Sequence, residues 1–129
     1  MSKIERFEDI VAWQKARELT KGLYAQTRIG AFAKDFGLKD QIQRASVSIM
    51  ANVAEGFDRG GDKEFVQFLS VSKGSCGEVK SHLYVALDQQ YVTPAQFTHL
   101  YNSADEVGRL LSGFMGYLQQ SDLKGRKFK

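Results

Sequence analysis

The residues of this chain that could carry metal or acid–base chemistry are few, and their spacing matches no common catalytic arrangement. Di-iron helical bundles need a Glu-x-x-His motif on each of two helices. Here Glu78 and His82 are four residues apart, and Glu106 is not followed by a histidine. His82 and His99 could approach each other from neighbouring helices and would supply at most two ligands. We expect no metal site and no catalytic site, with both histidines at a surface or an interface.

The other reactive groups also favour structural roles. Cys76, the single cysteine, falls on the apolar face of its predicted helix and should behave as a small hydrophobic residue. One cysteine excludes an intrachain disulfide and fits a reducing compartment. The segments Gly60-Gly61 and Lys73-Gly74-Ser75 lack the spacing of a phosphate-binding loop. We therefore predict a non-enzymatic protein that requires no cofactor.

Four segments must position these side chains, and all four have the apolar spacing of α-helices. Apolar residues recur at helical intervals over residues 9–28, 38–56, 62–89 and 94–120. Thr93-Pro94-Ala95-Gln96 has the composition of a capping box with proline at the first helical position. Gly56 is expected to end the second helix and Asp62 to cap the third. The alternation typical of β-strands is absent.

The connections between these segments are short. Residues 30–37 are predicted to form a loop with Phe32 and Phe36 turned inward, and residues 58–62 a flexible turn. Four amphipathic helices joined in this way predict an all-α, antiparallel, up-down-up-down four-helix bundle over residues 1–121. One domain of this length can bury roughly two-thirds of its unfolded surface.

The second predicted helix has almost no polar side. From Ala45 to Phe57 its only charged residue is Glu55. A helix that is apolar nearly all round is usually buried all round, and one small core cannot easily cover every face. We infer that copies of this chain assemble into a ring-like homo-oligomer.

A polar seam runs along this helix between two apolar strips. Wound at helical pitch, its members fall within an arc of about 80°; they are Gln41, Arg44, Ser48, Asn52 and Glu55. In an antiparallel pair, Ser48 would face the level of Ser72 and Ser75 on the third helix. Because an unpaired buried polar group costs on the order of 1–3 kcal/mol, we predict an Arg44–Glu78 pair that fixes helix register. In the alternative interpretation, Arg44 binds a phosphate or carboxylate.

Small residues recur within the third and fourth predicted helices. They are Gly74, Ser75, Gly77, Gly108, Ser112, Gly113 and Gly116. Each glycine inside a helix costs roughly 1 kcal/mol relative to alanine. We expect close helix–helix or subunit contact as the compensation, and a ligand-facing cleft is the alternative.

Positive charge is concentrated at the C-terminal end. The chain has a net charge of +3, and residues 122–129 contain four positive residues and one negative residue, which leaves 14 of each sign in residues 1–121. This tail is predicted to be flexible and could contact nucleic acid phosphates, although a solvated terminus is the commoner outcome. The candidate contacts are Lys124, Arg126, Lys127 and Lys129 in the tail and Lys15, Arg17, Lys21 and Arg28 on the first helix.

Nothing in the chain indicates a membrane or secretory protein. No apolar stretch approaches the roughly 18 residues of a membrane span. The first residues, Met1-Ser2-Lys3-Ile4-Glu5-Arg6, lack the apolar run of a signal peptide. We expect a cytoplasmic protein.

Several segments together carry a family resemblance. They are Phe7–Ala16, Tyr24, Thr27, Gly37–Leu38, Gln41–Ala45, Ser48–Ile49, Asn52–Gly56, Phe65, Phe68–Leu69, Gly74–Ser75 and Glu78. In these segments the chain resembles the bacterial proteins encoded in intervening sequences of 23S ribosomal RNA genes. The resemblance spans most of the chain, and the run from Gln41 to Gly56 is quite specific, whereas the fourth helix and the tail match only generically.

The resemblance implies a four-helix bundle that assembles into a homopentamer, with no catalytic residues to carry over. More remotely, the chain is similar to the accessory proteins of diversity-generating retroelements, which form pentameric barrels, bind nucleic acid and contact a reverse transcriptase. The neutral body departs from a basic binding surface, yet five tails would gather about +15 on one assembly. We therefore expect a self-assembling protein that binds RNA or DNA. The alternative is an oligomeric scaffold for a protein partner, without nucleic acid.

Overall fold

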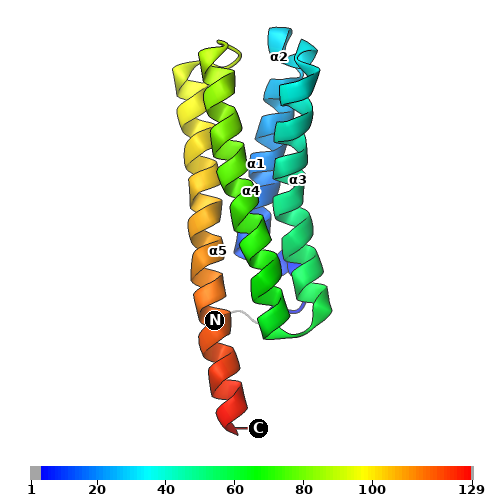
Figure 1. Ribbon diagram of the computed structural model, residues 1–129, viewed down its shortest axis with the longest axis vertical. Coiled ribbons are helices and arrows are strands. Elements are labelled where there is room, and N and C mark those ends of the chain that lie inside the picture. Colours follow the sequence, from blue (N-terminus) through cyan, green and yellow to red (C-terminus); the bar gives the residue numbers. More distant parts are fainter. Residues whose placement is uncertain (1–3, 129) are drawn as a thin grey trace.

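The computed structural model describes the backbone of residues 4–128 and the side chains of residues 4–120. Four long helices lie side by side, with a short helix at one end (Figure 1). In chain order the elements are the 3-10 turn η1 (Phe7–Asp9), α1 (Val11–Thr27), α2 (Gly30–Lys34), α3 (Phe36–Arg59), α4 (Asp62–Asp88) and α5 (Pro94–Phe128). The described residues contain no strand. The all-helical prediction is confirmed.

The core contains apolar side chains from all four long helices. Ile42, Ile49 and Val53 of α3 are fully buried, as the periodicity of that helix predicts. Cys76 is 3% exposed within the same core. Burial raises the pKa of its thiol to about 12, because the thiolate would lose its hydration there. The interpretation of Cys76 as a core residue is thus confirmed.

Helix α3 is longer at both ends than the sequence predicts. It begins at Phe36 because the Asp35 side chain caps it, accepting a hydrogen bond from the Leu38 backbone N–H at 3.1 Å. It does not end at Gly56, so that prediction is wrong; it ends at Arg59, and Gly60 follows with φ of +87°. Glycine adopts this left-handed conformation without the steric cost that other residues bear.

Gly56 has a packing role instead of a terminating one. A Cβ atom at this position would lie 2.7 Å from Phe65 Cδ1 and 2.8 Å from Phe68 Cβ. Only glycine therefore lets the end of α3 approach the start of α4 this closely. The sequence pattern marks Gly56 correctly as special but assigns it the wrong function.

The start of α5 agrees with its predicted capping box. The Thr93 N–H donates to Gln96 Oε1 at 2.8 Å, and the Gln96 N–H donates to Thr93 Oγ1 at 3.1 Å. The predicted cap at Asp62 is wrong: this residue is the first of α4, and Gly61 stands at the cap position without a side-chain bond.

Helix α5 continues to Phe128, past its expected end near residue 120. Residues 121–128 contain no proline, and lysine, arginine and leucine among them favour helix. The predicted flexible tail is therefore the last part of this helix. The side chains of Lys124, Arg126 and Lys127, and all of Lys129, lie outside the described residues.

The connection between α1 and α3 differs most from its prediction. It contains the short helix α2, and Phe32 is 1% exposed, as expected. Phe36, however, is 74% exposed, which contradicts the prediction that its ring turns inward. Leu38 and Ile42 occupy the core face of α3, and Phe36, at the first position of that helix, lies on the outward side.

Candidate interaction surfaces

The polar seam between α3 and α4 is satisfied within the chain. Ser75 donates from its Oγ to Ser48 Oγ at 3.0 Å, and Asn52 Nδ2 donates to Ser48 Oγ at 3.1 Å. Ser72 Oγ donates to the Ile49 carbonyl at 2.9 Å. Ser48 therefore faces the level of Ser72 and Ser75, as predicted. Among the described residues, no buried side-chain nitrogen or oxygen lacks a hydrogen-bond partner.

The predicted Arg44–Glu78 pair is wrong. Arg44 Nε donates instead to Asp40 Oδ2 at 2.8 Å, one turn earlier on the same helix, and the Arg44 side chain is 79% exposed. Glu78 is exposed and forms no ion pair with any residue whose side chain is described. A neighbour four residues away can bind Arg44 without removing either charge from water, which makes the pair with Asp40 less costly.

The two ends of the seam, like Arg44, are exposed to solvent. Gln41 is exposed, and Glu55 accepts a hydrogen bond from Arg59 at 3.0 Å. The pKa of Arg59 is raised by its hydrogen bond to Glu55 and by the nearby charge of Glu64. Of the seam, the centre around Ser48 and Ser75 makes a partly buried polar contact, and the two ends are exposed.

Apolar side chains remain uncovered on the outer surface of α3 and α4. Val47 is 44% exposed, Val71 is 53% exposed, and Ala51 is also exposed. At helical pitch, Val47 and Ala51 lie about 160° from the buried Ile49 of α3, and Val71 lies about 140° from the buried Cys76 of α4, so all three face away from the core. Helix α3 is therefore not buried on every side within one chain.

Several glycines of α4 and α5 have no packing role among the residues whose side chains are described. A Cβ atom added at Gly74, Gly77, Gly113 or Gly116 would have no neighbour among them within 4 Å. At Gly108 it would make an ordinary contact of 3.9 Å with Cys76. Close approach of helices in one chain therefore does not compensate the helical cost of these four glycines.

On α4, two of these glycines belong to a row of small residues. Ser70, Gly74, Gly77 and Ser81 are all exposed and follow one another at steps of four, three and four residues. At helical pitch this places them on one face, opposite the buried stripe of Leu69, Cys76 and Leu83. We call this the small-residue face of α4.

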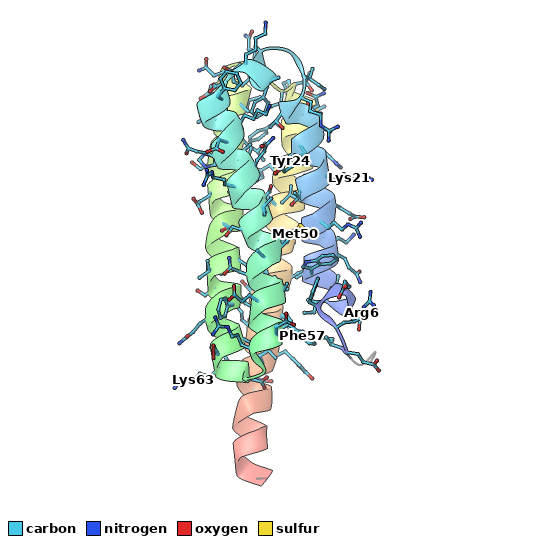
Figure 2. The ribbon with its side chains drawn as sticks, turned by 90° about the vertical axis from the view of Figure 1, so that its right-hand side faces the viewer. Arg6, Lys21, Tyr24, Met50, Phe57 and Lys63 are labelled. Atoms are coloured by element: carbon cyan, nitrogen blue, oxygen red, sulfur yellow. The ribbon has the colours of Figure 1, made fainter. Side chains whose placement is uncertain are left out.

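Three of the predicted nucleic-acid contacts form a strip along α1. Arg17, Lys21 and Arg28 are exposed, and at helical pitch they lie within about 40° of one another over roughly 16 Å. Lys21 projects away from the bundle (Figure 2). Lys15 lies apart from this strip, where it is half-buried and 3.8 Å from Glu18. The Arg17 guanidinium lies over the Trp13 ring at 5.9 Å.

Two cavities open at the surface of the bundle, one between α1 and α5 and the other where the start of α1 meets the turn between α3 and α4. One, of about 860 Å³, is lined by both cationic and anionic side chains, among them Lys15, Lys21, Glu18, Glu106 and Arg109. The other, of about 1020 Å³, is mainly apolar and is lined by residues such as Val11, Phe57, Phe114 and Tyr117. Positive and negative side chains thus offset each other in the first cavity, and the second offers mainly apolar surface.

The histidines do not form a shared site. His99 lines the cavity between α1 and α5, whereas His82 is not among the lining residues of either cavity. Within the described part of the chain, no three histidine, cysteine, aspartate or glutamate side chains are placed to hold a metal ion. None of the described helices is long and apolar enough to cross a membrane.

A partly exposed aromatic cluster that the sequence does not predict lies between α4 and α5. Tyr84, Phe97 and Tyr101 have ring centroids 4.9–5.8 Å apart, and Lys80 Nζ lies 4.9 Å from the Tyr101 ring. Lys80 also donates to Asp105 at 2.9 Å, which raises the pKa of Lys80 and lowers that of Asp105. Tyr84 and Phe97 are far apart in the sequence, so their spacing alone gives no signal.

A family model for the 23S rRNA-intervening sequence protein matches residues 8–113, most of the chain. The chain belongs to this family. The matched residues extend from η1 through α4 and include the first part of α5, whereas the basic end of α5 lies outside them. No curated protein matches the chain at a significant level.

A solved member of the S23 ribosomal protein family has the same fold. It is a protein of unknown function from Bacteroides thetaiotaomicron, with 23% identity and a TM-score of 0.74. The alignment covers 81% of this chain and 98% of the other. The family and the fold of this 23S rRNA-intervening sequence protein are thereby established. Its function must be argued from the surfaces described above.

Proposed function

We propose that this protein is a non-enzymatic subunit of a ring-like homo-oligomer, a pentamer, that binds RNA or DNA in the cytoplasm. Each subunit is an up-down-up-down antiparallel bundle. The small-residue face of α4 packs against a different face of the next subunit. Contacts between two different faces are heterologous, and they close into a ring when the rotation between subunits permits.

The observation that carries the assembly proposal is the open space around Gly74 and Gly77. Each glycine costs roughly 1 kcal/mol in a helix, yet an added Cβ at either position would meet nothing in the described part of the chain within 4 Å. A helix of a second subunit lying close against α4 gives these residues a packing role. The exposed Val71 and Val47 beside this face supply apolar surface for the same contact.

Nucleic acid binding is supported by the placement of positive charge. The strip of Arg17, Lys21 and Arg28 faces outward on α1, and the basic residues 124–129 end the same chain. In a ring, each subunit contributes one copy of each region to a shared surface. Phosphate contacts of this number make affinity fall steeply with salt.

The assembly is tested by measuring mass in solution for the wild type, Gly74→Leu and the matched variant Gly116→Leu. Both positions are open, so both variants should fold. Gly74→Leu is expected to reduce the assembly to smaller species, whereas Gly116→Leu retains it. A monomeric wild type, or a Gly74→Leu ring, would contradict the proposal.

Nucleic acid binding is tested by titrating salt against labelled RNA and DNA. We expect binding at low salt that weakens in Lys124→Gln/Lys127→Gln and in Arg17→Gln/Lys21→Gln. Absence of binding at low salt would leave the second candidate function, an oligomeric scaffold for a protein partner. The charge balance of residues 1–121, 14 of each sign, favours that candidate.

A further inference from the structure

We propose that single-stranded nucleic acid binds the end of the bundle where α1, α2 and α3 meet, with a base stacked on Phe36. We call this the end surface and define it by Arg28, Lys34, Phe36 and Lys39. The inference rests on the proposed nucleic acid binding, and it assigns that binding a place and a strand class.

The exposure of Phe36 is the first observation. At 74% it is the most exposed large apolar side chain described, followed by Ile29 at 59%. Core packing does not need this ring, because Phe32 already fills the inward position and stacks on Tyr91 at 5.1 Å. An exposed aromatic ring offers a face on which an unpaired base can stack, whatever the sequence of the strand.

The charge around Phe36 is the second observation. Residues 28–44 contain four positive residues and two negative ones, whereas residues 1–121 as a whole sum to zero. No carboxylate pairs with Arg28, Lys34 or Lys39 among the residues whose side chains are described. This local excess of unpaired cations is complementary to phosphate.

Both carboxylates of this segment already have partners. Asp35 accepts hydrogen bonds from the Leu38 N–H at 3.1 Å and from the Tyr91 hydroxyl at 2.9 Å. Asp40 binds Arg44 at 2.8 Å. Asp40 is thus neutralised by Arg44, whereas Asp35 bonds only to neutral donors and keeps its charge. With Asp35 counted against Arg28, Lys34 and Lys39, the end surface retains two excess positive charges. Asp35 also holds the start of α3, and so fixes the backbone position of Phe36.

The end surface continues the strip on α1. Arg28 is the last member of that strip and the first residue of the connection to α2. A strand that contacts Arg17 and Lys21 along α1 would therefore reach Phe36 beyond Arg28. Cations that track a backbone beside an aromatic platform are the usual arrangement for single-stranded nucleic acid.

Two other partners fit this surface less well. Binding in a membrane interface takes an amphipathic helix with a broad apolar face. Helix α2 has five residues, its one large apolar side chain, Phe32, is buried, and it carries Lys34. A second copy of the chain would bring no charge excess to meet these cations, because its body is neutral.

The test measures fluorescence anisotropy of labelled 20-nucleotide oligo(dT) and oligo(U) with the full-length protein at low salt. Phe36→Ala should weaken binding about fivefold or more, given the energy of one stacked base. Phe36→Trp should restore it. The matched control is Tyr84→Ala, which removes a half-exposed aromatic ring on α4, outside the end surface, and should leave affinity unchanged.

The cations are tested in the same assay. Lys34→Gln should lower affinity and reduce the slope of log affinity against log salt by about 0.7, the value for one phosphate contact to a single strand. Lys63→Gln is the control, because Lys63 is exposed in the first turn of α4, at the other end of the bundle (Figure 2). A duplex of the same length should bind more weakly than the single strand, because its bases are already stacked.

The outcomes separate this inference from the proposed function. Binding that is insensitive to Phe36→Ala but lost in Lys124→Gln/Lys127→Gln overturns the end surface and leaves nucleic acid binding intact. Failure of the wild type to bind any oligonucleotide overturns both. Phe36-dependent sedimentation with phosphatidylserine vesicles but not with oligonucleotides identifies a membrane surface. A change of assembly mass in Phe36→Ala identifies a subunit contact. The vesicle result and the mass result would each overturn the inference.

Discussion

Asp35 and Tyr91 join two connections that are distant in the sequence. The Tyr91 hydroxyl donates to Asp35 Oδ2 at 2.9 Å, while Asp35 Oδ1 accepts from the Leu38 N–H. The Tyr91 ring also stacks on Phe32 at 5.1 Å. One carboxylate thus caps α3 and holds the turn between α4 and α5 at the same end of the bundle (Figure 1).

The Asp35–Tyr91 bond should make stability depend on pH in the alkaline range. The hydrogen bond to Asp35, with burial and the charge of Asp35, raises the pKa of Tyr91 above its usual 10.0. Because the folded state favours the neutral phenol, this contribution is complete below pH 10 and is lost as pH rises through the folded pKa. We expect Tyr91→Phe to be less stable than the wild type at pH 7, with a difference that shrinks above pH 10. Urea unfolding at both pH values measures it.

Asp35→Ala serves as the comparison for that experiment. It removes the cap as well as the bond to Tyr91, so it should cost at least the roughly 1 kcal/mol of a lost N-cap. Its effect at neutral pH should exceed that of Tyr91→Phe. Equal stability of the wild type and both variants at pH 7 would show that the bond contributes nothing.

Gly56→Ala should destabilise the fold. The new methyl group would lie within 2.8 Å of both Phe65 and Phe68, so α3 and α4 must separate or the rings must shift. Overpacking of this kind typically costs about 1–3 kcal/mol. Chemical denaturation followed by circular dichroism gives the free energy of unfolding.

Gly113→Ala is the matched control for Gly56→Ala. It adds the same methyl group to a helix, but no described residue of another helix lies within 4 Å of the new atom. Removal of the glycine penalty should then stabilise the folded chain by up to about 1 kcal/mol. Opposite signs for the two variants are the expected result, and a Gly56→Ala variant as stable as Gly113→Ala would refute the packing argument.

Local rules explain why the helices and the α5 cap could be predicted. The apolar periodicity of α3 and the sequence Thr93–Gln96 each depend on residues within a few positions of one another. The core positions Ile42, Ile49 and Cys76 follow from the same periodicity. The Ser48–Ser75 contact was also predictable, because an antiparallel pair joined by a short turn has one register.

The failures arise where distant residues or local competition decide the outcome. Gly56 resembles a helix stop, but Phe65 and Phe68 from the next helix determine its role. Phe36 looks like a core residue by type, but Phe32 and Leu38 already occupy the inward positions. Arg44 could face Glu78 in register, but Asp40 lies nearer along its own helix. The end surface combines two of these failures, since it depends on the outward position of Phe36 and on the pairing of Asp40 with Arg44.

Two double-mutant cycles should separate the buried centre of the polar seam from its exposed edge. Arg44→Ala and Glu78→Ala should be additive within about 0.5 kcal/mol, because the two side chains do not pair in the folded chain. Ser48→Ala and Ser75→Ala should be coupled by about 0.5–1.5 kcal/mol, because each removes one end of a single hydrogen bond. Unfolding free energies of all four single and both double variants are required. Coupling in the first cycle and none in the second would reverse our assignment.

The Cys76 thiol should be nearly inert in the folded protein. Burial raises its pKa to about 12, from an ordinary value of 9.0, so the reactive thiolate is about a thousandfold scarcer than in the unfolded chain near neutral pH. Reaction with a disulfide reagent at pH 8 should therefore be slow and should accelerate in denaturant. A Cys76→Ala/Ser112→Cys variant, with its thiol at an exposed position of α5, is the control and should react rapidly in the folded state. Equally rapid reaction of wild-type Cys76 would place this thiol at the surface and contradict the packing of α4 against α5.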